Sequence, residues 1–256
     1  MESPTYLHAG KVINSRYRLI TPIGSGTLAQ VYLADDIRVR KQTIVKVFDA
    51  PFRSGNEVED DFQISLQDLA RTSHPNLIKI LDWGSGEISY IVTEFLAGGD
   101  LRAMLQQDAS LSVAQITLIM MEILKGTSFL HERGKVHGGL KPENVIFSLN
   151  GDLKLSDTGM GSVSAKYFSS ELVTEGPYVS PELSQGGLLS PAADVYAIAA
   201  IFKELIHTKL PESKNTAETQ EIDSELLKEL ETVFASALSA KASERPTANA
   251  LSLIHI

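Results

Sequence analysis

Alternating hydrophobic and polar residues dominate the first hundred positions of the chain. After a polar lead-in over residues 1–15, this alternation predicts five strands, in segments 17–26, 30–36, 42–50, 76–83 and 89–96. Residues 56–73 interrupt the series with apolar positions at helical spacing and acidic residues near their start, which predicts one helix. Residues 16–96 are therefore expected to form a five-stranded antiparallel sheet with one helix.

From residue 97 onward the hydrophobic period becomes helical. Helices are expected in segments 101–107, 112–134, 192–207, 225–238 and 247–254. Two short strands, 145–148 and 152–157, flank a turn at Asn150-Gly151. The pattern predicts an α+β fold whose second part, 97–256, is mainly helical, and ligands commonly bind between two such parts.

Composition narrows the class of protein. A hydrophobic content of 43% and a charged content of 21% are typical of soluble globular domains. The net charge of −9 disfavours nucleic-acid binding, and the lack of cysteine excludes disulfides, thiolate zinc sites and cysteine nucleophiles. The apolar runs are too short for a membrane segment and no signal peptide is evident, so we expect a cytoplasmic protein. The ending LSLIHI resembles a translated sequencing adapter, so we expect a C-terminal continuation to be missing.

Four short segments occur in an informative order. They are GSGTLAQV at 24–31, TIVK at 43–46, HGGLKPEN at 137–144 and SDTG at 156–159, and SPE at 180–182, Asp194 and Arg245 follow them. Each segment alone is a weak signal, but the ordered set resembles the eukaryotic-type protein kinase domain over residues 16–252, with bacterial serine/threonine kinases nearest. The resemblance implies a bilobal kinase fold, with the five-stranded sheet and its helix as the N-lobe and a mainly helical C-lobe.

The resemblance also implies a nucleotide site for ATP. It assigns cofactor binding to Gly24, Gly26, Val31, Lys46, Glu94 and Leu96. Three departures from the family pattern weaken this expectation: Ala29 replaces the third glycine of the loop, Ile44 replaces the alanine over the adenine ring, and Ser65 replaces the glutamate that pairs with the lysine. We therefore expect weak ATP binding or none.

Two further positions match the family's magnesium ligands. Asn144 and Asp157 offer the oxygen atoms that Mg²⁺ prefers, and Mg²⁺ takes its remaining ligands from phosphates and water. A simpler interpretation of Asp157 is a turn cap, since Thr158-Gly159 follows it. The ordered spacing favours the metal interpretation.

The catalytic loop lacks its base. The family reads H-R-D-x-x-x-x-N here, whereas this chain has Gly138 and Gly139 in place of the arginine and the aspartate. Loss of a general base costs about 10²–10⁴ in rate. Lys141 remains and would neutralise the transferring phosphate if the chain is active.

By contrast, the architectural positions of the family are retained. Glu182 and Arg245 match the family's buried ion pair, and Asp194 matches the residue that anchors the catalytic loop backbone.

Three functions remain open. The favoured one is a pseudokinase, a signalling or scaffolding module that acts by contacting another protein. The second is an active serine/threonine kinase with non-standard catalytic residues. The third, a small-molecule phosphotransferase, is disfavoured because that family needs the same missing aspartate.

Overall fold

The computed structural model describes residues 7–25, 29–48, 64–84, 88–160, 176–210 and 217–252. They belong to two compact units. The first is built mainly from residues up to 73 together with Ile78–Phe95, and the second from His74–Leu77 and most of the chain from Leu96 onward.

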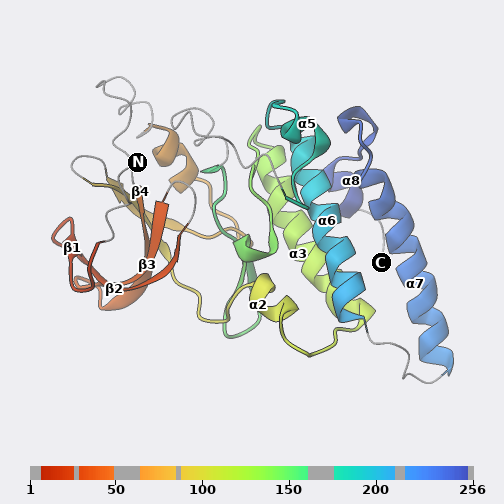
Figure 1. Ribbon diagram of the computed structural model, residues 1–256, viewed down its shortest axis with the longest axis horizontal. Helices are drawn as coiled ribbons and strands as arrows, with labels where there is room; N and C mark the ends of the chain where they lie inside the picture. Colours follow the sequence, from red (N-terminus) through yellow and green to blue (C-terminus); the bar gives the residue numbers. More distant parts are fainter. Residues whose placement is uncertain are drawn as a thin grey trace. The chain divides into compact units, whose positions relative to one another are not determined.

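A six-stranded antiparallel sheet forms the first unit (Figure 1), in the order β1-β2-β3-β4-β6-β5. Its strands are β1 (Val12–Ile13), β2 (Tyr17–Ser25), β3 (Ala29–Asp36), β4 (Lys41–Phe48), β5 (Ile80–Gly84) and β6 (Ser89–Glu94). A helix covers residues 64–70, so the predicted single helix is confirmed within the described part of segment 56–73.

The prediction of five strands was wrong by one. The extra strand, β1, lies in the expected lead-in and pairs with β2 through Val12↔Arg18 and Ile13↔Tyr17. Two residues are too few to show a period in the sequence. Ile13 is nevertheless only 3% exposed, so burial against the sheet holds this strand in place.

Burial alternates along the central strands. On one face Tyr32, Ala34, Val45 and Val47 join a buried apolar cluster, as the period of two requires. The residues between them on β3 and β4 are half-buried, and they form the face that carries the predicted nucleotide residues.

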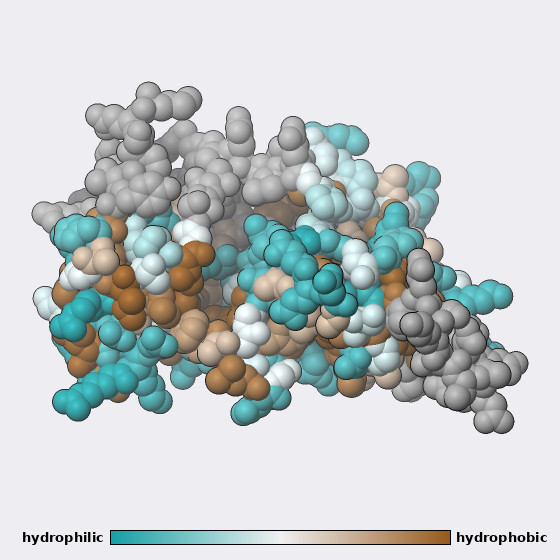
Figure 2. Space-filling model, turned by 60° about the horizontal axis from the view of Figure 1, so that its bottom comes forward, coloured by the Kyte–Doolittle hydropathy of each residue, from teal (hydrophilic) through white to brown (hydrophobic). Residues whose placement is uncertain are grey.

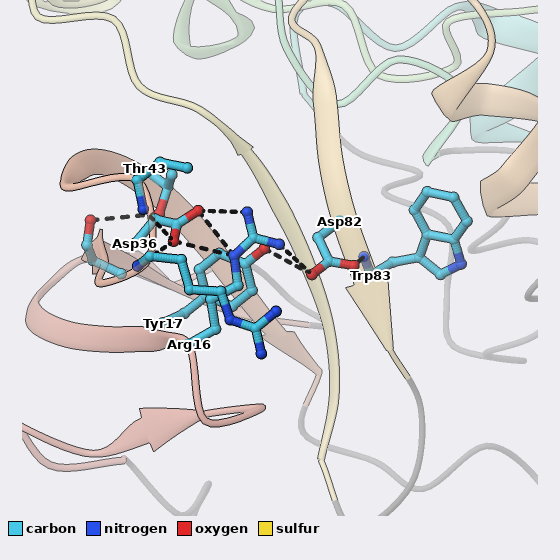
Figure 3. Close-up of polar contacts among 9 residues, drawn as sticks. Arg16, Tyr17, Asp36, Thr43, Asp82 and Trp83 are labelled. Carbon is cyan, nitrogen blue, oxygen red and sulfur yellow. Dashed lines mark hydrogen bonds and ion pairs between the residues drawn. The ribbon is translucent and has the colours of Figure 1, made fainter.

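A polar cluster ties three parts of this unit together (Figure 3). The guanidinium of Arg16 donates to both carboxylate oxygens of Asp36, at 2.7 to 3.1 Å, and lies 3.6 Å from a carboxylate oxygen of Asp82. Tyr17 donates to the same Asp82 oxygen at 2.7 Å. Asp36 also accepts from the backbone N–H groups of Arg38 and Val39, which closes the β3–β4 turn.

The second unit is mainly helical. Its helices are α2 (Leu101–Leu105), α3 (Val113–His131), η1 (Pro142–Asn144), α5 (Pro181–Ser184), α6 (Pro191–Lys209), α7 (Ala217–Ala237), η2 (Ala242–Glu244) and α8 (Ala248–Ser252). The short strands β7 (Val145–Phe147) and β8 (Leu153–Leu155) form the expected hairpin, with Gly151 in its turn at φ +89°.

Helix α3 is the core of the second unit. Ser112 and Gln115 form a reciprocal capping box that fixes its start, and its apolar residues join a cluster with α6, α7 and α8. These helices lie side by side in Figure 1. Among the described residues, α3 is also long and apolar enough to cross a membrane, but 61% of that stretch is buried inside the protein, as in the core helix of a globular domain.

Some large hydrophobic side chains are exposed, among them Leu188 at 88% and Leu149 at 80%. On the face drawn in Figure 2, hydrophobic residues are interspersed with hydrophilic ones. Single exposed hydrophobics of this kind are ordinary on protein surfaces.

Candidate functional site

The first unit brings three of the predicted nucleotide residues onto adjacent strands. Gly24 on β2 pairs with Val31 on β3, and Val31 pairs with Lys46 on β4. Val31 and Lys46 are partly exposed and share the sheet face opposite the apolar core. Gly26, assigned to the same loop, lies outside the described residues.

Two of the residues that depart from the family pattern lie in described parts of this unit, one on β4 and one in the helix over residues 64–70. Ile44 pairs with Leu33 and lies two residues before Lys46, so it presents its branched side chain on the same face. Ser65 lies in the helix over residues 64–70 and offers a hydroxyl where the family pattern has a carboxylate.

The remaining two assigned nucleotide residues lie where β6 ends. Glu94 pairs with Thr43, and its carboxylate accepts a hydrogen bond from the backbone N–H of Lys79 at 2.8 Å. Leu96 follows two residues later, is partly buried, and belongs to the second unit.

In the second unit, Asp194 holds the catalytic loop. Its carboxylate accepts from the backbone N–H groups of His137 at 2.8 Å and Gly138 at 2.9 Å, and it lies 2.9 Å from Nε2 of His131. This confirms the anchoring role predicted for Asp194. The His137 ring is fully buried, and that burial lowers its pKa, so it is a packed residue of the loop.

Gly139, where the family places its base, has room for a side chain. A Cβ atom there would meet only Nδ2 of Asn144, at 3.9 Å, and the backbone is outside the left-handed region. Gly138 differs, because its φ of +72° lies in the region that favours glycine. The geometry at position 139 therefore does not require a glycine.

A backbone hydrogen bond joins the segments that carry Asn144 and Asp157. Nδ2 of Asn144 donates to the carbonyl oxygen of Gly139 at 2.7 Å, and the backbone N–H of Ser156 donates to the carbonyl oxygen of Asn144 at 2.8 Å. Asp157 has a φ of +60°, and residues held in this uncommon conformation cluster at functional sites.

The donor set of these two residues fits Mg²⁺. They supply one carboxylate and one amide oxygen, and Mg²⁺ is bound in phosphoryl-transfer sites by one or two carboxylates and by phosphate oxygens. Nowhere in the described ranges do three or more His, Cys, Asp or Glu residues gather as a metal cage. Mg²⁺ at this position would take its remaining ligands from phosphate oxygens and water.

Lys141 and Glu143 flank the proline that begins η1. Lys141 is exposed. Glu143 instead accepts a hydrogen bond from Nε of Arg102 at 2.9 Å, and Nη1 of Arg102 also donates to Glu204 at 2.6 Å. Burial alone would raise the pKa of Glu143, but a backbone hydrogen bond and Arg102 hold it below its usual range.

Tyr178 completes this network. It accepts from Nη2 of Arg102 at 2.5 Å and donates to Glu204. Burial, followed by the hydrogen bond to Glu204, raises the pKa of Tyr178 to about 12. Sequence reasoning missed this network because the contacts of Arg102 span 41 to 102 residues of chain and no local pattern signals them.

The predicted ion pair between Glu182 and Arg245 is confirmed. Two parallel hydrogen bonds of 2.7 Å join them, and Arg245 also donates to the carbonyl oxygens of Ser239 and Ala192. The Arg245 side chain is fully buried, so the pair fixes α5 to the start of α6 and to η2.

Comparisons with known proteins agree with this arrangement. The chain is 30% identical over 207 residues to the serine/threonine-protein kinase PrkC of Bacillus subtilis, covering 79% of this chain and 32% of the relative. It is 33% identical over 214 residues to the probable serine/threonine-protein kinase PknB of Lactococcus lactis, covering 80% of this chain and 34% of the relative. The chain therefore spans about a third of the length of these relatives.

Solved structures share the fold. The PknI kinase domain of Mycobacterium tuberculosis matches with a TM-score of 0.71 at 22% identity, over 96% of this chain and 97% of that one. The model of the protein kinase domain family matches residues 17–255. The chain therefore belongs to the protein kinase domain family, and among its relatives are bacterial serine/threonine kinases.

Proposed function

We propose that this chain is a pseudokinase: a cytoplasmic, bacterial serine/threonine kinase-like domain that transfers phosphate poorly or not at all and acts by contacting another protein. The observation that carries the proposal is Gly139, which stands at the base position of a loop that is otherwise held as in a kinase. Without a carboxylate there, no group of residue 139 can accept the proton of a substrate hydroxyl.

The surroundings of Gly139 support this proposal. Glu143 is the acidic residue nearest in sequence, and its carboxylate is engaged by Arg102. A carboxylate paired with a guanidinium is a poor proton acceptor, because the positive charge favours its ionised form.

Weak nucleotide binding is part of the proposal. Ile44 adds a branched side chain on the sheet face that carries Lys46, and this narrows the space for an adenine ring. Ser65 offers no charge to orient the Lys46 ammonium. When bound, Mg²⁺ would neutralise phosphate charge, with Asn144 and Asp157 as its protein ligands and Lys141 beside the transferred group.

A second candidate is an active kinase that has displaced its catalytic groups. Its support is the retention of Lys46, Asn144 and Asp157 together with the intact anchoring by Asp194. Catalysis of phosphoryl transfer is almost entirely positioning and electrostatic stabilisation, which these retained groups would supply without a base.

Thermal unfolding of the purified chain with ATP tests the proposal. A ligand present at 100 times its dissociation constant stabilises a protein by about 2.7 kcal/mol, so a working site gives a clear rise in melting temperature. We expect little or no rise at millimolar ATP with Mg²⁺, and the same curve for the Asp157→Ala variant. A large rise that requires Mg²⁺ and disappears in Asp157→Ala would contradict weak binding.

A further inference from the structure

The turn between β3 and β4 concentrates positive charge. Residues 37–41 read IRVRK and are all exposed, and we call them the β3–β4 tip. Within the described part of the chain, none of its three cations, Arg38, Arg40 and Lys41, forms an ion pair. The whole chain carries a net charge of −9, so the tip has the opposite sign to its protein. No residue of the tip belongs to the predicted nucleotide site or to the catalytic loop.

Two aliphatic side chains alternate with these cations. Ile37 is 40% exposed and Val39 is 55% exposed. An exposed aliphatic side chain gains free energy when a partner's apolar surface covers it. Arginine, in turn, forms paired, charge-assisted hydrogen bonds with carboxylates. A surface that is both acidic and apolar therefore matches the tip.

The backbone of the β3–β4 tip is held in place. The carboxylate of Asp36 accepts from the backbone N–H groups of Arg38 at 3.0 Å and Val39 at 3.4 Å, and its carbonyl oxygen accepts from that of Arg40 at 2.8 Å. Asp36 is only 2% exposed and is fixed by the guanidinium of Arg16 (Figure 3). Arg40 has a φ of +55°, which is uncommon for a residue with a side chain and persists where the surroundings fix it. Such preorganisation lowers the entropy cost of binding.

The acids beside the tip leave its charge uncompensated. Asp36 is engaged by Arg16, as described above. Asp35 is partly buried and pairs in register with Arg18 of β2, an exposed cation, so these two opposite charges balance. The three cations of the tip remain for a partner.

The size of the patch indicates the class of partner. Salt screens charges beyond about 8 Å at physiological ionic strength, so a short acidic segment would interact with the tip alone. A bilayer or a nucleic acid extends further and would also meet the acids that give the chain its net charge of −9. A second copy related by a two-fold axis would bring the cations of two tips together. A short acidic segment is therefore the partner that the charge distribution favours.

We infer that the β3–β4 tip is a docking site for a short acidic segment of a partner protein that also carries aliphatic residues. Arg38 and Arg40 would bind its carboxylates, Lys41 would add attraction, and Ile37 and Val39 would contact its aliphatic side chains. The inference deepens the proposed function and rests on it, because it describes the partner of a domain that acts by contact.

Fluorescence anisotropy with a labelled peptide of alternating glutamate and leucine tests the site on the full chain. The control peptide has glutamine in place of every glutamate. We expect the acidic peptide to bind at least about tenfold more tightly than the control, and to weaken about tenfold when NaCl is raised from about 50 mM to about 500 mM. Equal binding of the two peptides, or no binding of either, would overturn the inference.

Charge reversal identifies the surface. Arg38→Glu combined with Arg40→Glu should abolish binding of the acidic peptide. Lys203→Glu combined with Lys228→Glu changes the net charge by the same amount on exposed positions of α6 and α7, and should leave the affinity within about twofold. Val39→Ser keeps the charge and should weaken binding about threefold, because an apolar contact is lost. Equal losses in the two double variants would contradict docking at the tip.

NMR of the parent avoids dependence on folded variants. We expect the acidic peptide to shift the backbone amide signals of Arg38 and Val39 and to leave that of Gly139 unchanged. Binding of the chain to phosphatidylserine vesicles through the tip, or dimerisation that the Arg38 and Arg40 exchange abolishes, would replace the peptide partner by a bilayer or a second copy. ATP turnover by the parent would refute the pseudokinase without changing peptide binding, so the two failures are distinguishable.

Discussion

Asn144 donates a hydrogen bond from its side-chain amide to the carbonyl oxygen of Gly139, at 2.7 Å. The contact joins a predicted metal ligand to the position where the family's base is missing. Asp194 holds the same loop by accepting a hydrogen bond from the backbone N–H of Gly138, at 2.9 Å. The loop backbone is therefore held by Asn144 and Asp194 although residue 139 carries no carboxylate. Replacements at 138 and 139 test separate properties of this loop.

The two glycines should respond differently to alanine. Gly139→Ala should raise the free energy of unfolding by about 0.4–1 kcal/mol, because its backbone accepts any residue and its Cβ would meet no close neighbour. Gly138→Ala should lower it by about 1–3 kcal/mol, because φ is +72° there. Denaturant unfolding measures both. Equal effects would show that the loop does not have this backbone conformation.

The ion pair between Arg245 and Glu182 should contribute more to the free energy of unfolding than exposed ion pairs do. Arg245→Ala removes a fully buried guanidinium that binds both oxygens of Glu182, and should cost about 3–5 kcal/mol of unfolding free energy. Lys241→Ala breaks an exposed pair with Glu244 and should leave the melting temperature nearly unchanged. A small effect of Arg245→Ala would mean that the pair does not hold α5 in place.

Acid should lower the stability of the first unit, because it protonates Asp36. The hydrogen bonds from Arg16 hold the pKa of Asp36 below its ordinary value of 3.8. Its contribution to stability is therefore fully present above pH 3.8 and is lost as the pH falls through the lower folded-state pKa. The Asp36→Asn variant should be less stable than the parent at pH 7, and the difference in unfolding free energy should shrink toward pH 2. A difference independent of pH would contradict this account.

The two buried threonines of α3 offer a matched pair. Thr127 donates to the carbonyl of Ile123 at 2.9 Å, so Thr127→Val should lower the unfolding free energy by about 1 kcal/mol. Thr117 has no such bond, so Thr117→Val removes an unpaired buried hydroxyl and should raise stability by about 1 kcal/mol. Equal losses in both variants would show that the Thr117 hydroxyl does have a partner in the folded protein.

The sequence predicted the features that local patterns encode. The alternation on β3 and β4, the Asn150-Gly151 turn and the long apolar face of α3 all lie within short stretches of chain. The pairing of Glu182 with Arg245 and the anchoring by Asp194 followed from the family motifs, although 63 and about 57 residues separate the partners.

Features that arise from packing alone were not predictable. β1 has two residues, too few for a hydrophobic period, and is held by pairing with β2. Arg102 reaches Glu143, Tyr178 and Glu204 across long chain separations, and its position in α2 gives no local signal of this. The Thr117 hydroxyl is buried without a hydrogen-bond partner where α3 packs against three other helices, and the residues next to it in the sequence do not indicate this.

The most direct test of the central claim is ATP turnover by the purified chain. Hydrolysis and self-phosphorylation are measured with Mg²⁺ and with Mn²⁺, in the parent and in Asp157→Ala. Without a base at position 139, we predict no turnover in the parent that exceeds the Asp157→Ala background. Parent turnover that is abolished by Asp157→Ala would show that the catalytic groups have been displaced but not lost.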